Sequence, residues 1–190
     1  MAELLSDAKK LELLSFARAT IEEYLKEGTR RPPLLAAGPY AKKCGAFVTL
    51  HSKGRLRGCI GNMVGEGPLA LTIRDMAIAA ATGDPRFHRV DKDEMTSVDI
   101  EISVLTPLEK LDDVSKIEVG KHGILLKRGY HQGVLLPQVA SEYGWDRETF
   151  LSQTCQKAGL LPDAWKDSQT EIFVFSAEVF GEKDFADQKT

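Results

Sequence analysis

Seven consecutive residues near the middle of the chain alternate between apolar and polar side chains, and this alternation constrains the fold most. They lie in the segment VDIEISVL, residues 98–105, in which Val98, Ile100, Ile102 and Val104 alternate with Asp99, Glu101 and Ser103. Successive side chains of a β-strand point to opposite faces of a sheet. The pattern therefore predicts a strand that is half buried, with one face in the core and the other in water.

Further strands are predicted on both sides of this segment, most of them in hairpins. Residues 44–51 (CGAFVTLH) precede a tight turn at 52–55 and a partner strand at 55–61. A second hairpin joins 123–128 to 133–136, and residues 172–180 are predicted to form one final strand. Hairpins pair consecutive strands antiparallel, so the sheet is expected to be antiparallel.

Helices are predicted at residues 7–26, 68–82, 137–143 and 146–158. Apolar residues recur there at helical spacing, and glycines follow the first, second and fourth segments as stop signals. Strands in hairpins with separate clusters of helices favour an α+β fold, an antiparallel sheet flanked by helices. We expect the 190 residues to form a single domain, with room for a smaller subdomain.

Composition argues against several classes of protein. The net charge of −3 and the pI of about 5.9 give no general attraction to nucleic acid. No apolar stretch approaches the roughly 20 residues that span a membrane, and the N-terminus does not resemble a signal peptide. The three cysteines and four histidines show no metal-binding spacing, so no metal or cofactor is predicted. A cytoplasmic protein with reduced thiols is expected.

The segment Leu56–Gly61 (LRGCIG) is the best candidate for a functional site. On a regular strand Arg57, Cys59 and Gly61 face the same way, which would place a guanidinium beside a thiol. A nearby positive charge stabilises the thiolate, so Cys59 is a candidate nucleophile or redox centre. The alternative is that Cys59 is a small buried hydrophobe, as free cysteines often are.

The expected hairpin register bears on this choice. If Lys53–Gly54 is a two-residue turn, Leu50 lies opposite Arg57 and Val48 lies opposite Cys59, on an apolar face. Arg57 then needs a carboxylate or a bound anion, because burying its charge unpaired is costly. Arg57 is therefore a candidate binding residue.

Glycines in the strand and the loop that follows it add further candidates. Gly58 and Gly61 weaken a strand, and one reason to tolerate them is the close approach of another group, so both are candidate binding residues. Asn62 opens a loop that leads to the helix predicted from residue 68, whose N-terminus could hold a small anion. An ordinary connection between strand and helix is the alternative.

Charged residues elsewhere complete the list. Glu101 and Asp99 lie on the polar side of the alternating strand, where they could pair with Arg57 or Arg86 or simply face water. Glu101 is a candidate acid or base, and Arg86 is a candidate binding residue.

Six blocks of sequence, taken together, resemble one known family. They are Leu56–Gly61, Asp84–Phe87 (DPRF), Ile100–Pro107 (IEISVLTP), Gly133–Ala140 (GVLLPQVA) with Trp145, Lys157–Gly159 and Ala177–Phe180. The chain resembles the AMME chromosomal-region domain family, called AmmeMemoRadiSam system protein A in prokaryotes, over nearly its whole length.

The resemblance implies an α+β fold in which both chain ends build a larger subdomain, with a smaller one inserted and Leu56–Gly61 near a cleft. It also implies radical-SAM and Memo-like companion proteins, but no particular reaction. Three functions remain open. The protein is an enzyme using Cys59 and gripping an anion, an adaptor that docks a partner or peptide, or a nucleic-acid-associated protein, which the acidic pI disfavours.

Overall fold

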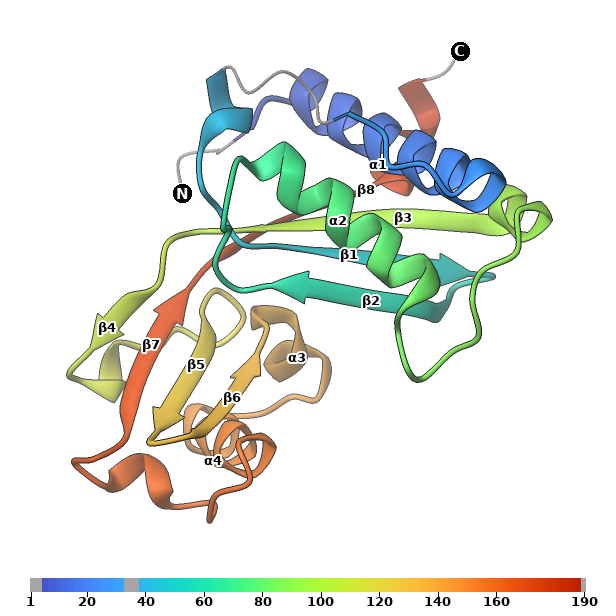
Figure 1. Ribbon diagram of the computed structural model, residues 1–190. Coiled ribbons are helices and arrows are strands. Elements are labelled where there is room, and N and C mark those ends of the chain that lie inside the picture. The colour runs from blue at the N-terminus through green and yellow to red at the C-terminus, as the bar shows by residue number, and fades with distance from the viewer. Residues whose placement is uncertain (1–4, 33–37, 189–190) are drawn as a thin grey trace. The chain divides into compact units, whose positions relative to one another are not determined.

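The computed structural model describes residues 5–32 and 38–188, and the α+β class is confirmed (Figure 1). The chain divides into two compact units: Met1–Leu105 with Glu178–Thr190, and Thr106–Ala177. Each unit contains an antiparallel sheet of four strands. In the part of the chain described, no helix combines the length and apolar character needed to cross a membrane.

The first unit is a sheet with two helices on one face (Figure 1). Its strand order is β2 (Arg55–Asn62), β1 (Ala46–Ser52), β3 (Val98–Leu105) and β8 (Ala177–Gly181). The helices are α1 (Asp7–Glu27) and α2 (Leu69–Thr82). Residues 98–105 form β3, an inner strand of this sheet. The prediction that one face of this strand lies in water is wrong at its end, because Ser103 and Leu105 are buried.

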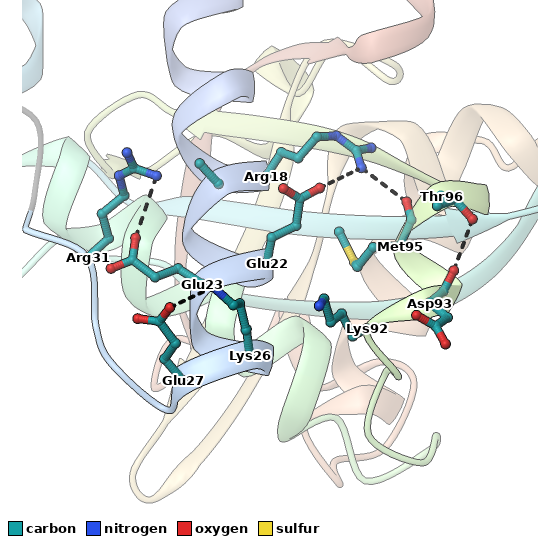
Figure 2. A pocket seen from close by; sticks show the side chains of 11 residues that line it. Arg18, Glu22, Glu23, Lys26, Glu27, Arg31, Lys92, Asp93, Met95 and Thr96 are labelled. Carbon is teal, nitrogen blue, oxygen red and sulfur yellow. Dashed lines mark hydrogen bonds and ion pairs between the residues drawn. The ribbon is translucent and has the colours of Figure 1, made fainter.

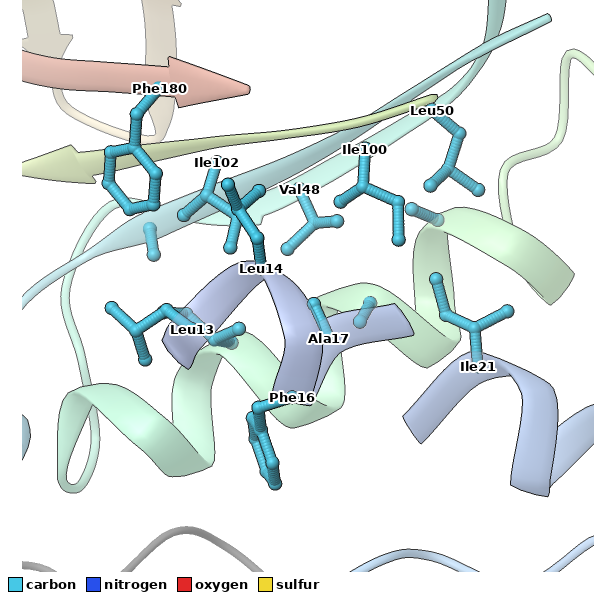
Figure 3. Packing of buried hydrophobic residues seen from close by; sticks show 14 of the residues in the cluster. Leu13, Leu14, Phe16, Ala17, Ile21, Val48, Leu50, Ile100, Ile102 and Phe180 are labelled. Carbon is cyan, nitrogen blue, oxygen red and sulfur yellow. The ribbon is translucent and has the colours of Figure 1, made fainter. Parts of the chain in front are cut away.

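Side chains of α1 point at the covered face of the sheet and form the core of this unit (Figure 3). The fully buried residues include Leu13, Leu14, Ala17 and Ile21 of α1, Val48 and Leu50 of β1, and Ile100 and Ile102 of β3. Burying each large aliphatic side chain contributes about 1.5–3 kcal/mol to stability. Val48 and Leu50 therefore fix which face of β1 meets the helices.

The turn between β1 and β2 has the predicted form. Lys53 and Gly54 have positive φ angles of 51° and 75°, as expected for a two-residue hairpin turn. The strands pair at Ser52–Arg55 and then at His51–Leu56, which is the register predicted from the sequence.

Beyond these two pairs the predicted register is wrong by one residue. A β-bulge leaves Arg57 without a partner in β1, so Cys59 pairs with Thr49 and not with Val48. Because neighbouring residues of a strand face opposite ways, Cys59 lies on the face opposite the buried Val48. The apolar environment predicted for Cys59 is corrected accordingly.

The second unit has the sheet order β4 (Glu109–Leu111), β7 (Glu171–Phe175), β5 (Gly123–Arg128) and β6 (His131–Leu135). It also contains α3 (Pro137–Glu142) and α4 (Arg147–Lys157). Its core includes Ile124, Leu126, Phe150 and Leu151. Short 3-10 helices occur in both units, namely η1 (Gly38–Ala41), η2 (Asp93–Ser97), η3 (Val114–Lys116), η4 (Ala164–Lys166) and η5 (Glu182–Gln188).

The single strand predicted for residues 172–180 is wrong, because this segment forms two strands, β7 and β8, in different sheets. The chain changes sheet at Ser176. The Ser176 N–H donates to Thr106 Oγ1 at 2.8 Å, and the Thr106 N–H donates to the Ser176 carbonyl at 2.9 Å. These bonds satisfy the backbone at the break, which apolar patterning alone does not reveal.

Candidate functional site

Three side chains form a row across the face of the first sheet that lies opposite α1 and α2. Cys59 of β2 pairs with Thr49 of β1, which pairs with Glu101 of β3. All three are half-buried, and Thr49 Oγ1 lies 3.2 Å from Cys59 Sγ, within hydrogen-bond distance. Adjacent strands lie about 4.8 Å apart, so the Cys59 and Glu101 backbones are about 10 Å apart. The structure thus brings both predicted catalytic residues to one face.

Burial disfavours the thiolate form of the other two cysteines. Burial raises the pKa of the Cys44 thiol, against a smaller opposing effect of Lys42. Burial also raises the pKa of Cys155, which is fully buried in the core of the second unit. Since the thiolate is the reactive form, burial lowers the reactivity of Cys44 and Cys155.

Arg57 does not lie beside the thiol as predicted. Its Nε donates to Glu94 Oε1 at 2.5 Å and its Nη2 donates to Oε2 at 3.0 Å, a bidentate ion pair with η2. It also donates to the backbone carbonyls of His88 at 2.9 Å and Arg89 at 3.4 Å. The bulge at Arg57 breaks the alternation that would have placed it with Cys59. The carboxylate that the sequence required for Arg57 is thus Glu94, whose pKa the Arg57 hydrogen bonds lower.

A second arginine contacts Cys59 through the backbone. Arg86 Nη2 donates to the Cys59 carbonyl at 3.4 Å, and Asp84 Oδ2 accepts from the Cys59 N–H at 2.9 Å. The Asp84 side chain is only 2% exposed, whereas that of Arg86 is 54% exposed. Hydrogen bonds from Arg86 hold the pKa of Asp84 far below its usual range, so the buried carboxylate stays ionised.

The close approaches predicted at the two glycines are made by the protein itself. A Cβ on Gly58 would collide with the backbone carbonyl of Ala80 in α2. A Cβ on Gly61 would collide with the ring of Phe47. These contacts explain the glycines by packing and leave their predicted binding roles without support from the local geometry.

The loop after β2 is held by ordinary turn contacts. Asn62 Oδ1 accepts from the Val64 N–H at 3.2 Å, which is a local turn bond. At the start of α2 the Leu69 N–H donates to the Lys42 carbonyl at 2.9 Å, so this amide is already occupied. The alternative of a plain strand-to-helix connection is the simpler account of both observations.

A groove of about 620 Å³ lies elsewhere in the first unit, between α1 and η2 (Figure 2). Several of its charged side chains pair with one another: Arg18 with Glu22, Arg31 with Glu23 and Lys26 with Glu27. Arg18 also pairs with Glu182, which lies outside the groove lining. None of the residues predicted for the site lines this groove. In the chain as described, no group of three or more His, Cys, Asp or Glu side chains could hold a metal ion.

Comparison with known proteins assigns the chain to a family. The family model described as AMMECR1 matches residues 14–180. The chain belongs to the AMMECR1 family. Similar proteins include one from Methanothermobacter thermautotrophicus, 46% identical with 90% of this chain and 92% of the relative covered. Another, from Methanosarcina barkeri, is 43% identical with 95% and 94% covered.

A solved structure supports the same fold for this AMMECR1-family chain. The crystal structure of the uncharacterized protein PH0010 from Pyrococcus horikoshii matches with a TM-score of 0.89 and 41% identity. The match covers 95% of each chain. The family predicted from Leu56–Gly61 and the other sequence blocks is therefore confirmed.

Three residues of the site were missed by sequence reasoning. Thr49 was missed because the predicted register placed Val48 opposite Cys59. Glu94 lies 37 residues from its partner Arg57, a separation that no local pattern marks. Asp84 left a clearer signal, because an aspartate followed by proline favours a turn closed by its own side chain. Asp84 Oδ1 does accept from the Arg86 N–H at 3.1 Å.

Proposed function

We propose that this AMMECR1-family protein is an enzyme, or a component of an enzyme system, that acts through the Cys59 thiol on the face of the first sheet opposite α1 and α2. One observation carries the proposal. The backbone N–H of Cys59 donates to Asp84 at the edge of the sheet, and the half-buried thiol of Cys59 lies 3.2 Å from the Thr49 hydroxyl. A thiol held in one place beside a hydrogen-bonding group suits a nucleophile or a redox centre.

The row formed by Cys59, Thr49 and Glu101 suggests a separate chemical role for each side chain. The Thr49 hydroxyl can donate to a thiolate and stabilise it. Glu101 lies two strands from Cys59, with Thr49 between them. In this proposal Glu101 acts on the substrate as an acid, a base or a binding group.

Competitive alkylation tests the proposal. The folded protein is treated with limiting iodoacetamide at pH 7, and the modification of each cysteine is measured by peptide mass spectrometry. We expect Cys59 to react at least tenfold faster than Cys44, because burial raises the pKa of Cys44. Thr49→Val should slow the reaction at Cys59 and leave Cys44 unchanged. If Cys59 reacts more slowly than Cys44, the thiol chemistry is wrong.

A second candidate is an adaptor that binds a companion protein, such as a radical-SAM or Memo-like protein, without chemistry. It is favoured by the exposure of Leu56 (40%) in β2 and of Val64 (59%) in the loop that follows β2. Exposed apolar side chains of this kind contribute to protein contacts when a partner covers them. The substitutions Leu56→Glu and Val64→Glu would then abolish binding of a purified companion, whereas Cys59→Ala would not. If Cys59→Ala abolishes function and the two glutamate substitutions do not, the result supports the enzyme.

A location in the cytoplasm fits the proposal. The three cysteines are free, and a reducing compartment keeps thiols in that state.

A further inference from the structure

At the outer edge of β2, two side chains make the hydrogen bonds to the Cys59 backbone that a neighbouring strand would otherwise make. β2 is an edge strand, and edge strands leave every second pair of N–H and C=O groups unpaired. At Cys59 both groups are satisfied from outside, because Asp84 accepts from the N–H at 2.9 Å and Arg86 donates to the carbonyl at 3.4 Å. An acceptor and a donor on one residue are what a paired strand would offer.

The two residues that provide these contacts hold each other in a single arrangement. Arg86 Nε donates to Asp84 Oδ1 at 2.9 Å and Arg86 Nη2 donates to Oδ2 at 2.7 Å, a bidentate pair. The Arg86 N–H adds a third bond to Oδ1. A buried carboxylate with this many partners cannot move away without losing several charge-assisted bonds at once. The pair is therefore a rigid support for the backbone of Cys59.

We propose that Asp84 and Arg86 are positioning residues for Cys59: they replace the missing strand at that one residue and so fix the direction of its thiol. The support is local. Gly61 is the next residue of β2 with the same orientation, and among the residues described no comparable pair meets its backbone. The consequence for reactivity rests on the proposed function, whereas the consequence for the backbone does not.

Amide hydrogen exchange measured by NMR tests the support for the backbone. In the wild-type protein we expect the Cys59 amide to be at least tenfold more protected than the Gly61 amide. Asp84→Ala should remove this difference and leave Gly61 within twofold of wild type. Asp84→Asn keeps an acceptor oxygen and serves as the matched variant, with intermediate protection, if Asp84→Ala does not fold. Equal protection of Cys59 and Gly61 in the wild type would overturn the proposal.

Side-chain couplings and alkylation test the positioning. Three-bond couplings should show one χ1 rotamer for Cys59 in the wild type and averaging in Asp84→Ala and Arg86→Lys. Lysine keeps the charge but cannot form the bidentate fork. Iodoacetamide should react with Cys59 at a rate changed at least threefold in both variants, with Cys44 unchanged as the internal control. A single rotamer retained after amide protection is lost would refute the positioning role. Slow alkylation of wild-type Cys59, with the rotamer and exchange results as expected, refutes the proposed function alone.

Discussion

Substituting Gly58 by alanine separates packing from binding at β2. The added methyl group would collide with the backbone carbonyl of Ala80 in α2. A backbone carbonyl cannot rotate away as a side chain can, so α2 or β2 must shift, and such overpacking costs about 1–3 kcal/mol. Replacing glycine also restricts the unfolded chain, which returns about 0.4–1 kcal/mol. The net loss expected for Gly58→Ala is about 1–2 kcal/mol.

Urea unfolding followed by circular dichroism measures this loss. With a slope of about 2 kcal/mol per molar urea, the midpoint should fall by about 0.5–1 M. Tryptophan fluorescence gives an internal comparison, because Trp145 and Trp165 both lie in the second unit. We expect the Gly58→Ala loss to be larger in the dichroism signal than in fluorescence.

A second substitution shows whether the collision is with backbone. Ala80→Gly removes a side chain but leaves the carbonyl in place, so it should not rescue Gly58→Ala. A rescue would mean that the contact involves the Ala80 side chain. If Gly58→Ala unfolds within about 0.3 kcal/mol of wild type, the packing explanation is refuted and a ligand at Gly58 again becomes the better account.

Three further predictions concern ion pairs and a helix cap. Arg57→Met should lower the free energy of unfolding by about 1–2 kcal/mol, and adding Glu94→Leu should cost little more, as a double-mutant cycle by urea unfolding will show. Because the pKa of Asp84 in the folded protein is depressed, its contribution to the free energy of unfolding is complete at pH values above the ordinary carboxyl pKa. This contribution is lost as the pH falls below that value. Thermal unfolding of Asp84→Asn should therefore vary less than wild type between about pH 5 and pH 2. Asp146→Ala removes the acceptor for the Thr149 N–H at the start of α4 and should lower the unfolding midpoint seen by tryptophan fluorescence; an unchanged midpoint would contradict the cap.

The parts of the fold that follow from local patterns could be predicted from the sequence. The alternation at 98–105 gave β3, Lys53–Gly54 gave the hairpin turn, and the first helix ends at Gly28 as its stop signal indicated. Each of these depends on neighbouring residues and on backbone preferences alone. The family resemblance rests on short sequence blocks, and it too needed no knowledge of long-range contacts.

The parts that failed depend on contacts between distant segments. The bulge at Arg57 is stabilised by an ion pair to Glu94 and by hydrogen bonds to backbone carbonyls of the loop that precedes Glu94. The sequence of the hairpin does not indicate any of these contacts. The break at Ser176 depends on Thr106, 70 residues earlier. In both places the local sequence pattern is compatible with the incorrect prediction. The observed structure depends on a hydrogen bond between residues that are distant in the sequence.

The residues of the segment Leu56–Gly61 therefore differ in their contacts. Arg57 pairs with Glu94 of η2 and Gly58 packs against α2, whereas Cys59 places its thiol on the face of the sheet opposite α2. This division predicts opposite outcomes for the two arginines near the strand. Arg57→Met should lower stability while the alkylation rate of Cys59 stays within twofold of wild type, because its guanidinium is committed to Glu94. Arg86→Lys should change that rate at least threefold, because it loosens the pair that holds the Cys59 backbone. A large change in Cys59 reactivity caused by Arg57→Met would show that Arg57 and Cys59 are coupled after all.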